Sequence, residues 1–141
     1  MPLNDYSSRF AAVLLEALPV FRGRLVERPG TECFTVEFQS PSGVSFWLQT
    51  EEEERLTVGF DTIHVHFGGW RESVDEEDFA QAIQYIRGIM ADEFVVIVEK
   101  GRDGSSSAQI IHKTAIPKPD EEVGYEFDIK SWSGNLRSGR P

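Results

Sequence analysis

The sequence predicts an α+β domain in which a mostly antiparallel β-sheet of six to seven strands packs with two α-helices. Two segments repeat apolar residues at helical spacing, and several others alternate with the period of two that strands have. The predicted order is helix, three to four strands, helix, three strands, which lacks the regular strand–helix alternation of parallel folds. A length of 141 residues suits one domain. We expect that domain over residues 1–132 and a flexible tail over 133–141, where glycine, serine and arginine dominate.

The first helix is predicted over residues 5–18. Pro19 follows directly, and a proline favours the end of a helix. The apolar residues of this segment recur three and four positions apart, as on one face of a helix. They are Tyr6, Phe10, Val13, Leu14, Ala17 and Leu18.

Strands follow, because the apolar period changes to two. Residues 34–38 and 44–48 alternate apolar and polar side chains on either side of a Ser-Pro-Ser-Gly turn sequence, which predicts a β-hairpin. A short strand over 24–27 precedes it. After an acidic connection, a strand is predicted over 56–67, which exceeds the usual length of roughly five or six residues. We therefore expect a bulge or a bend in this strand, with Gly59 as its place.

The second helix is predicted to begin at Ser73, which forms the pattern of a capping box with Glu76. Phe94–Val98 is apolar on both faces, so we expect it to be a central strand. A hairpin arm over 108–113 and a half-exposed strand over 125–129 complete the fold. The second helix carries an apolar stripe for the core. Its members are Phe79, Ala82, Ile83, Ile86, Ile89 and Met90.

Composition argues against two classes of partner. Fourteen basic and 24 acidic residues give a net charge of −10, which would repel the phosphates of nucleic acids. No apolar stretch approaches the roughly 18 residues that cross a bilayer, and no leader pattern begins the chain. We expect a cytoplasmic protein that binds neither nucleic acid nor membrane. Cys33 is the lone cysteine, so we expect a buried, inert thiol rather than a disulfide or a cysteine-based metal cage.

Three histidines are the residues best suited to carry chemistry. His64 and His66 are two positions apart on a predicted strand, so their imidazoles share a face. If the strand that carries His112 is a neighbour, three imidazoles with an open fourth position would suit a catalytic zinc ion. Asp61 is an alternative ligand, or an outer partner of an imidazole, if a bulge turns it toward the histidines. The competing interpretation is that these are ordinary polar or half-buried histidines, that Asp61 forms a local turn, and that no cofactor binds.

Acidic runs and tryptophans are the candidates for partner binding. Three acidic segments occur, at residues 51–54, 75–78 and 120–122, and they would complement a basic protein partner. The alternative is that these runs only solvate loops and the start of a helix. Tryptophans on polar faces or in loops often build binding surfaces, although single ones also cover the edges of a core. The candidate residues are Glu51, Glu52, Glu53, Glu54, Trp47, Trp70 and Trp132.

The segments Val58–Phe67 and Lys130–Gly134 resemble small acidic bacterial proteins of uncharacterised function, some of which are immunity partners of secreted toxins. The resemblance covers residues 56–70 and 125–136 and transfers no catalytic residue. It implies a bacterial, cytosolic protein.

The leading hypothesis from the sequence is a noncatalytic bacterial protein-binding module of the immunity type. It neutralises a basic partner through its acidic segments. The alternative is a metal-dependent enzyme of the hydrolase or lyase type, centred on His64, His66 and His112. The two hypotheses differ in what they predict. The enzyme needs the three imidazoles to meet, whereas the binding module predicts a specific basic partner whose affinity weakens with added salt.

Overall fold

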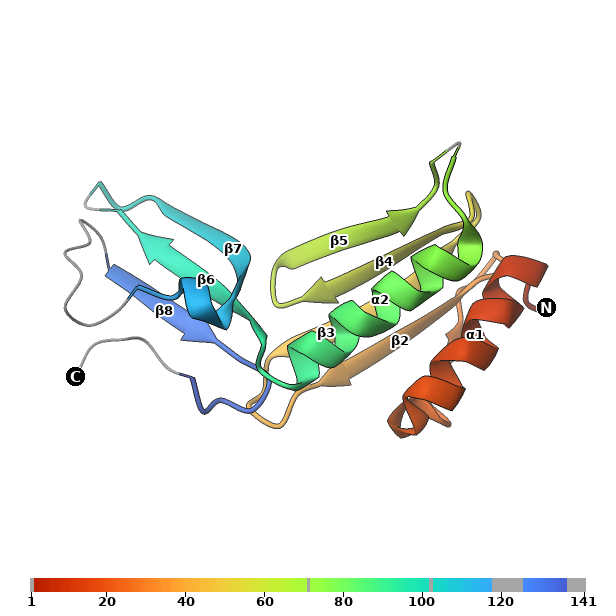
Figure 1. Ribbon diagram of the computed structural model, residues 1–141, viewed down its shortest axis with the longest axis horizontal. Helices are drawn as coiled ribbons and strands as arrows, with labels where there is room; N and C mark the ends of the chain where they lie inside the picture. The colour runs from red at the N-terminus through yellow and green to blue at the C-terminus, as the bar shows by residue number, and fades with distance from the viewer. Residues whose placement is uncertain (1, 71, 102, 118–125, 137–141) are drawn as a thin grey trace.

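The computed structural model describes residues 2–70, 72–101, 103–117 and 126–136, and this part of the chain is an α+β fold with two antiparallel sheets (Figure 1). The first sheet has five strands in the order β1-β2-β3-β4-β5, and the second has three in the order β7-β6-β8. The helices are α1 (Asp5–Ala17) and α2 (Asp75–Met90), with short 3-10 turns η1 (Pro19–Phe21) and η2 (Lys113–Ala115). The strands are β1 (Val26–Glu27), β2 (Phe34–Gln39), β3 (Ser45–Glu51), β4 (Arg55–Phe60), β5 (Ile63–Gly68), β6 (Phe94–Lys100), β7 (Ser106–His112) and β8 (Glu126–Lys130).

The α+β class, the two helices and the antiparallel pairing are confirmed, but the strand count and arrangement differ from the prediction. The segment expected to be one bent strand over 56–67 is the hairpin β4–β5, with Asp61 and Thr62 as its turn. Asp61 has a φ of 56°, a left-handed conformation that Asp tolerates better than most residues. Five strands therefore precede α2 instead of three or four, and the strands form two sheets instead of one.

This turn also explains why the apolar positions change parity along the segment. Residues that pair across a hairpin share a face, and Phe60 pairs with Ile63. The core side therefore continues from even-numbered residues on β4 to odd-numbered residues on β5. No bulge is needed for this change.

The main core lies between the five-stranded sheet and the two helices, which cover one of its faces (Figure 1). Asn4 caps α1 by accepting a hydrogen bond from the Ser7 amide at 2.7 Å. The predicted capping box at α2 is absent, because Val74 is the N-cap and the Ser73 hydroxyl donates to the Trp70 carbonyl at 2.9 Å. Fully buried core side chains include Phe10, Leu14, Phe21, Phe34, Val36, Phe46, Leu48, Leu56, Phe60, Ile86 and Ile89.

The other side of the first sheet faces away from both helices, and we call it the outer face. Strand alternation gives it a polar character, since side chains that neighbour the core residues along each strand point outward. The outer face consists of Thr35, Glu37, Trp47, Gln49, Glu51, Arg55, Thr57, Gly59, His64 and His66.

The segment that follows β8 packs against the first sheet and so holds the second sheet next to it. The predicted central strand is confirmed, since β6 lies between β7 and β8 with Val95–Ile97 buried. Trp132 lies 5.5 Å from Phe38 and 5.6 Å from Phe46, measured between ring centroids. The described chain continues to residue 136, and the Ser133 amide donates to Asp92 at 3.0 Å. Of the predicted tail, residues 137–141 lie outside the described residues.

None of the described helices is long and apolar enough to cross a membrane.

Candidate functional site

Two of the three predicted acidic segments meet at one end of the molecule. The turn between β3 and β4 carries the exposed Glu52, Glu53 and Glu54, and the start of α2 lies at the same end (Figure 1). The loop after β5 ties them together, because the Gly69 amide donates to the Glu54 carbonyl at 3.1 Å. We define the acidic end as Glu52, Glu53, Glu54, Trp70, Asp75, Glu76 and Glu77. The third acidic segment, residues 120–122, lies outside the described residues.

The pKa of the Tyr6 hydroxyl reflects the nearby negative charge of carboxylates from both segments. Burial of the Tyr6 side chain, followed by the nearby charges of Asp75, Asp78 and Glu54, raises the pKa of its hydroxyl. Arginines offset part of this charge, since Arg9 pairs with Asp75 at 2.7 Å, and Arg28 and Arg55 line a pocket together with Glu52 and Glu53. The acidic end therefore combines charges from the β3–β4 turn and from the start of α2 in one negative region.

Trp70 projects from this region into solvent. Its side chain is 75% exposed, the largest exposure among the large hydrophobic residues of the described chain. The residue lies between the β5 end and α2, directly after Gly69, which is bonded to the Glu54 carbonyl. An exposed indole at the acidic end is suited to contact a partner that brings both apolar and basic side chains.

The other two candidate tryptophans occupy different environments. Trp132 is only 7% exposed and belongs to the core, so it does not lie on a binding surface. Trp47 is half-buried on the outer face, with its indole over Gly59. Gly59 therefore provides space for an indole instead of a bend in the strand. The predicted set of partner-binding residues is thus divided among the acidic end, the outer face and the core.

His64 and His66, which we call the histidine pair, share the outer face as predicted. Both are exposed, and their ring centroids lie 5.1 Å apart with an interplanar angle of 65°. The Trp47 ring lies 6.1 Å from the ring of His64. A Trp-His-His row therefore crosses β3 and β5 above the glycine of β4.

A buried chain of hydrogen bonds fixes one of these imidazoles. The Thr57 hydroxyl donates to Glu51, and Nδ1 of His66 lies 2.7 Å from the same hydroxyl oxygen. A hydroxyl has one proton to donate, so the Thr57 oxygen must accept its second bond from Nδ1–H of His66. This assigns the tautomer in which Nε2 of His66 carries the free lone pair.

Glu51 is held as a carboxylate by the same network. Its burial would raise its pKa, but hydrogen bonds from Thr57, Arg55 and Gln49 oppose that effect and hold the pKa below its usual value. Arg55 contributes a bond from Nε at 2.7 Å. Glu51 is 9% exposed, so it belongs to this network and not to the exposed acidic end.

His112 does not join the histidine pair. It ends β7, and its ring lies 5.8 Å from that of Phe94. Phe94 stacks on Tyr85 of α2, which in turn contacts Phe67 of β5. Because Phe67 and the histidine pair point to opposite faces of β5, this row of rings places His112 on the helix-covered side. A three-histidine zinc site gains no support from this placement and stays a prediction.

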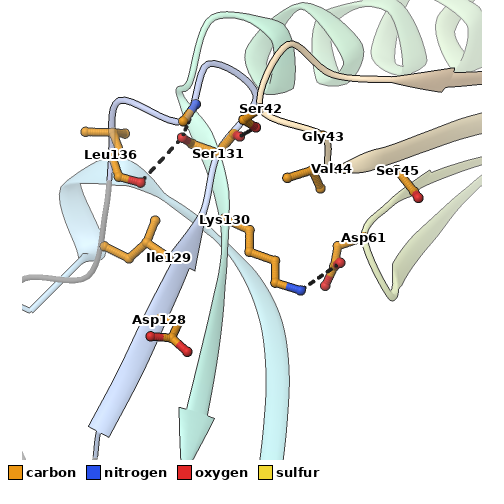
Figure 2. Close-up of a pocket in the computed structure, with 11 residues that line it drawn as sticks. Ser42, Gly43, Val44, Ser45, Asp61, Asp128, Ile129, Lys130, Ser131 and Leu136 are labelled. Atoms are coloured by element: carbon orange, nitrogen blue, oxygen red, sulfur yellow. Dashed lines mark hydrogen bonds and ion pairs between the residues drawn. The ribbon is translucent and has the colours of Figure 1, made fainter.

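Asp61 is directed toward the second sheet and away from the histidine pair. Its Oδ1 lies 3.0 Å from Nζ of Lys130 on β8, as Figure 2 shows. The two residues line a cavity of about 610 Å³ between the sheets. Asp128, also in its lining, pairs with Lys100 at 3.0 Å. The charged side chains of this cavity are therefore already neutralised by ion pairs.

Sequence reasoning missed the residues that organise the outer face. Thr57, Arg55 and Gln49 lie on two adjacent strands, and Thr57 pairs with Gln49 on one side and His66 on the other. Their positions in strands of alternating character would have identified them, once the hairpin turn at Asp61 was placed correctly. Their hydrogen bonds to Glu51 depend on the sheet register.

The geometry thus contains two features with functional potential, the acidic end with Trp70 and the histidine pair with its buried hydrogen-bond chain. Within residues 2–70, 72–101, 103–117 and 126–136, no group of three or more His, Cys, Asp or Glu side chains could hold a metal ion. Comparison with models of protein families, with curated proteins and with solved structures finds no match for this chain.

Proposed function

We propose that this protein is a noncatalytic protein-binding module that docks a basic protein partner on its acidic end, as a toxin-immunity protein does. The observation that carries the proposal is the position of Trp70, 75% exposed in the loop that is bonded to the acidic β3–β4 turn. A bacterial cytosolic setting, which the sequence resemblance implies, is part of the proposal.

Charge supports a basic partner. The whole chain carries a net charge of −10, and two acidic runs converge at one end. Surfaces of one sign steer an oppositely charged partner and accelerate association, more so at low ionic strength. The acidic residues at the start of α2 also interact with the helix dipole, but this does not account for the three glutamates of the β3–β4 turn.

Trp70 supplies the binding affinity that surface charges alone do not provide. Surface ion pairs contribute little affinity, whereas a central tryptophan is among the commonest residues with a large share of the binding energy. The carboxylates of the acidic end would then set orientation and association rate, and the indole would set the dissociation rate. The partner surface that fits this arrangement is an apolar pocket with lysines or arginines around it.

The test uses the full chain as bait in a bacterial lysate, followed by affinity measurements with the recovered basic protein. We expect Trp70→Ala to weaken binding about 30-fold, the effect of losing a hot-spot residue worth roughly 2 kcal/mol. A triple variant with Glu52, Glu53 and Glu54 changed to Gln should slow association and reduce its dependence on salt.

The matched control removes the same three charges elsewhere. Glu16, Glu37 and Glu93 are exposed and lie outside the acidic end, so their change to Gln should leave the association rate near that of the wild type. Equal effects of the two triple variants would show that only net charge matters. A partner whose affinity is indifferent to Trp70→Ala and to added salt would refute docking at the acidic end.

A further inference from the structure

The histidine pair, with its hydrogen bond to Thr57, has no part in the proposed binding of a partner at the acidic end. We propose that His64 and His66 bind a divalent transition-metal ion of the zinc class through their ring nitrogens, with Thr57 and Glu51 as the outer partners that orient His66. The site lies on the outer face and shares no residue with the acidic end. It consists of two protein ligands, so water or a donor atom from another molecule completes the coordination.

The separation of the two rings fits a shared metal ion. Two imidazoles that hold one zinc ion at nitrogen–metal distances of about 2.0–2.1 Å and a near-tetrahedral angle have ring centroids roughly 5 Å apart. The centroids of His64 and His66 are 5.1 Å apart. Both side chains are exposed, so an ion can reach the pair from solvent, and the exposed His64 ring can adjust to the orientation that Thr57 gives His66.

The hydrogen-bond chain behind His66 is of the kind that orients metal-binding histidines. Such a histidine usually donates its second ring N–H to an oxygen acceptor, which fixes the tautomer and raises the basicity of the ligating nitrogen. Here Nδ1 of His66 donates to the Thr57 hydroxyl at 2.7 Å, and Thr57 donates to Glu51. Nε2 of His66 is left with its lone pair for a metal ion.

The hydrogen-bond chain from Glu51 to His66 is held in place because Thr57 is buried and Glu51 is paired. Thr57 is 2% exposed, and Arg55 holds the Glu51 carboxylate. An exposed histidine on the outer face does not need a buried hydrogen-bond partner, since water can satisfy the hydrogen bonds of its imidazole. The network therefore gives His66 an orientation that plain surface exposure would not give it.

The donor set selects the class of metal. Imidazole nitrogens suit zinc, copper and nickel, whereas calcium and magnesium require oxygen ligands. The side chains of Asp61 and His112 are directed elsewhere, so we assign neither of them to the site. Trp47 lies 6.1 Å from His64, which provides an optical reporter, because a bound Cu²⁺ ion quenches the fluorescence of a nearby indole.

The experiment titrates the metal-free full chain with Zn²⁺ by calorimetry and with Cu²⁺ by tryptophan fluorescence. We expect one equivalent of Zn²⁺ to bind, with loss of binding in His64→Ala and in His66→Ala. Thr57→Val should weaken binding about 10-fold, as removal of an outer partner of a ligating histidine does. Thr57→Ser, which keeps the hydroxyl, should bind like the wild type. Thermal unfolding of each variant confirms that it is folded.

His112→Ala is the control that separates this site from a three-histidine site, and it should bind Zn²⁺ as the wild type does. Zinc binding that persists in the His64→Ala/His66→Ala variant would overturn the proposal, and so would zinc binding that is lost in His112→Ala. An unchanged affinity in Thr57→Val would overturn the role of the Thr57–Glu51 chain. Neither Trp70→Ala nor the acidic-end variants should alter zinc binding, so this proposal and the proposed function fail separately.

Discussion

The indole of Trp47 lies directly over Gly59, its register partner on β4, so closely that a Cβ at Gly59 would be 2.1 Å from Cε2 of the indole. The glycine is therefore required for contact between side chain and backbone, and not for flexibility. The Trp47 ring in turn flanks His64. A single small residue in the middle of the sheet thus determines how the aromatic row of the outer face is arranged.

Gly59→Ala should lower the free energy of unfolding by about 1–3 kcal/mol, the usual cost of forcing extra volume into a packed site. The added methyl group would displace the indole of Trp47. Urea denaturation followed by circular dichroism measures the change.

The control is the same substitution in a Trp47→Ala background. With the indole gone, the methyl group has room, so Gly59→Ala should then cost much less. A double-mutant cycle gives the coupling between the two positions. Equal costs in both backgrounds would mean that the glycine is needed for another reason.

Glu51→Gln should destabilise the protein by about 1–3 kcal/mol, because Arg55 and Thr57 would lose a charged acceptor in a buried site. Glu52→Gln is the matched variant, since Glu52 is adjacent and exposed, and it should stay within about 0.5 kcal/mol of the wild type. Denaturant midpoints at pH 7 compare the two variants.

The stability that Glu51 contributes should depend on pH in a defined direction. Its pKa is lower in the folded protein than its ordinary value of 4.5, so its contribution is fully present above that value. It is lost as the pH falls through the lower, folded-state pKa. The difference in unfolding free energy between wild type and Glu51→Gln should therefore shrink on acidification below about pH 4.5. A difference that grows on acidification would contradict the assigned direction.

Two tryptophan substitutions should have opposite consequences. Trp132→Ala removes a core side chain that packs on Phe38 and Phe46, and it should cost about 3–5 kcal/mol. Trp70→Ala, at an exposed position, should change stability by less than about 0.5 kcal/mol while weakening partner binding. Thermal and chemical unfolding of both variants tests this contrast. A large loss of stability in Trp70→Ala would mean that its loop is structural.

Asp61 combines a backbone role with an ion pair, and two substitutions separate them. Asp61→Gly keeps the positive φ of 56° and loses the pair with Lys130, so it should cost about 1 kcal/mol or less. Asp61→Val also places a β-branched residue in a left-handed conformation, which should add roughly 1–2 kcal/mol. Comparable stabilities of the two variants would show that the turn conformation can change at little cost.

Much of the fold was accessible from the sequence because it depends on local patterns. The apolar stripes of α1 and α2, the alternation in β2 and β3 and the apolar run Phe94–Val98 of β6 each carry their own signal. The hairpin β4–β5 was missed because its turn, Asp61 and Thr62, lacks the glycine that usually marks such a turn. Missing one two-residue turn changed the number of strands and hid the division into two sheets.

The sequence by itself determined that His64 and His66 share a face, because that follows from the alternation of side chains along any strand. It also determined the net charge and the presence of acidic runs. Only the tertiary structure decided which of these residues meet. The placement of Thr57 beneath His66, of the Trp70 loop beside the β3–β4 turn and of Trp132 in the core depends on sheet register and on contacts between residues distant in the chain. Such contacts leave no local periodicity in the sequence, and His112 was therefore separated from the histidine pair by packing that no spacing could reveal.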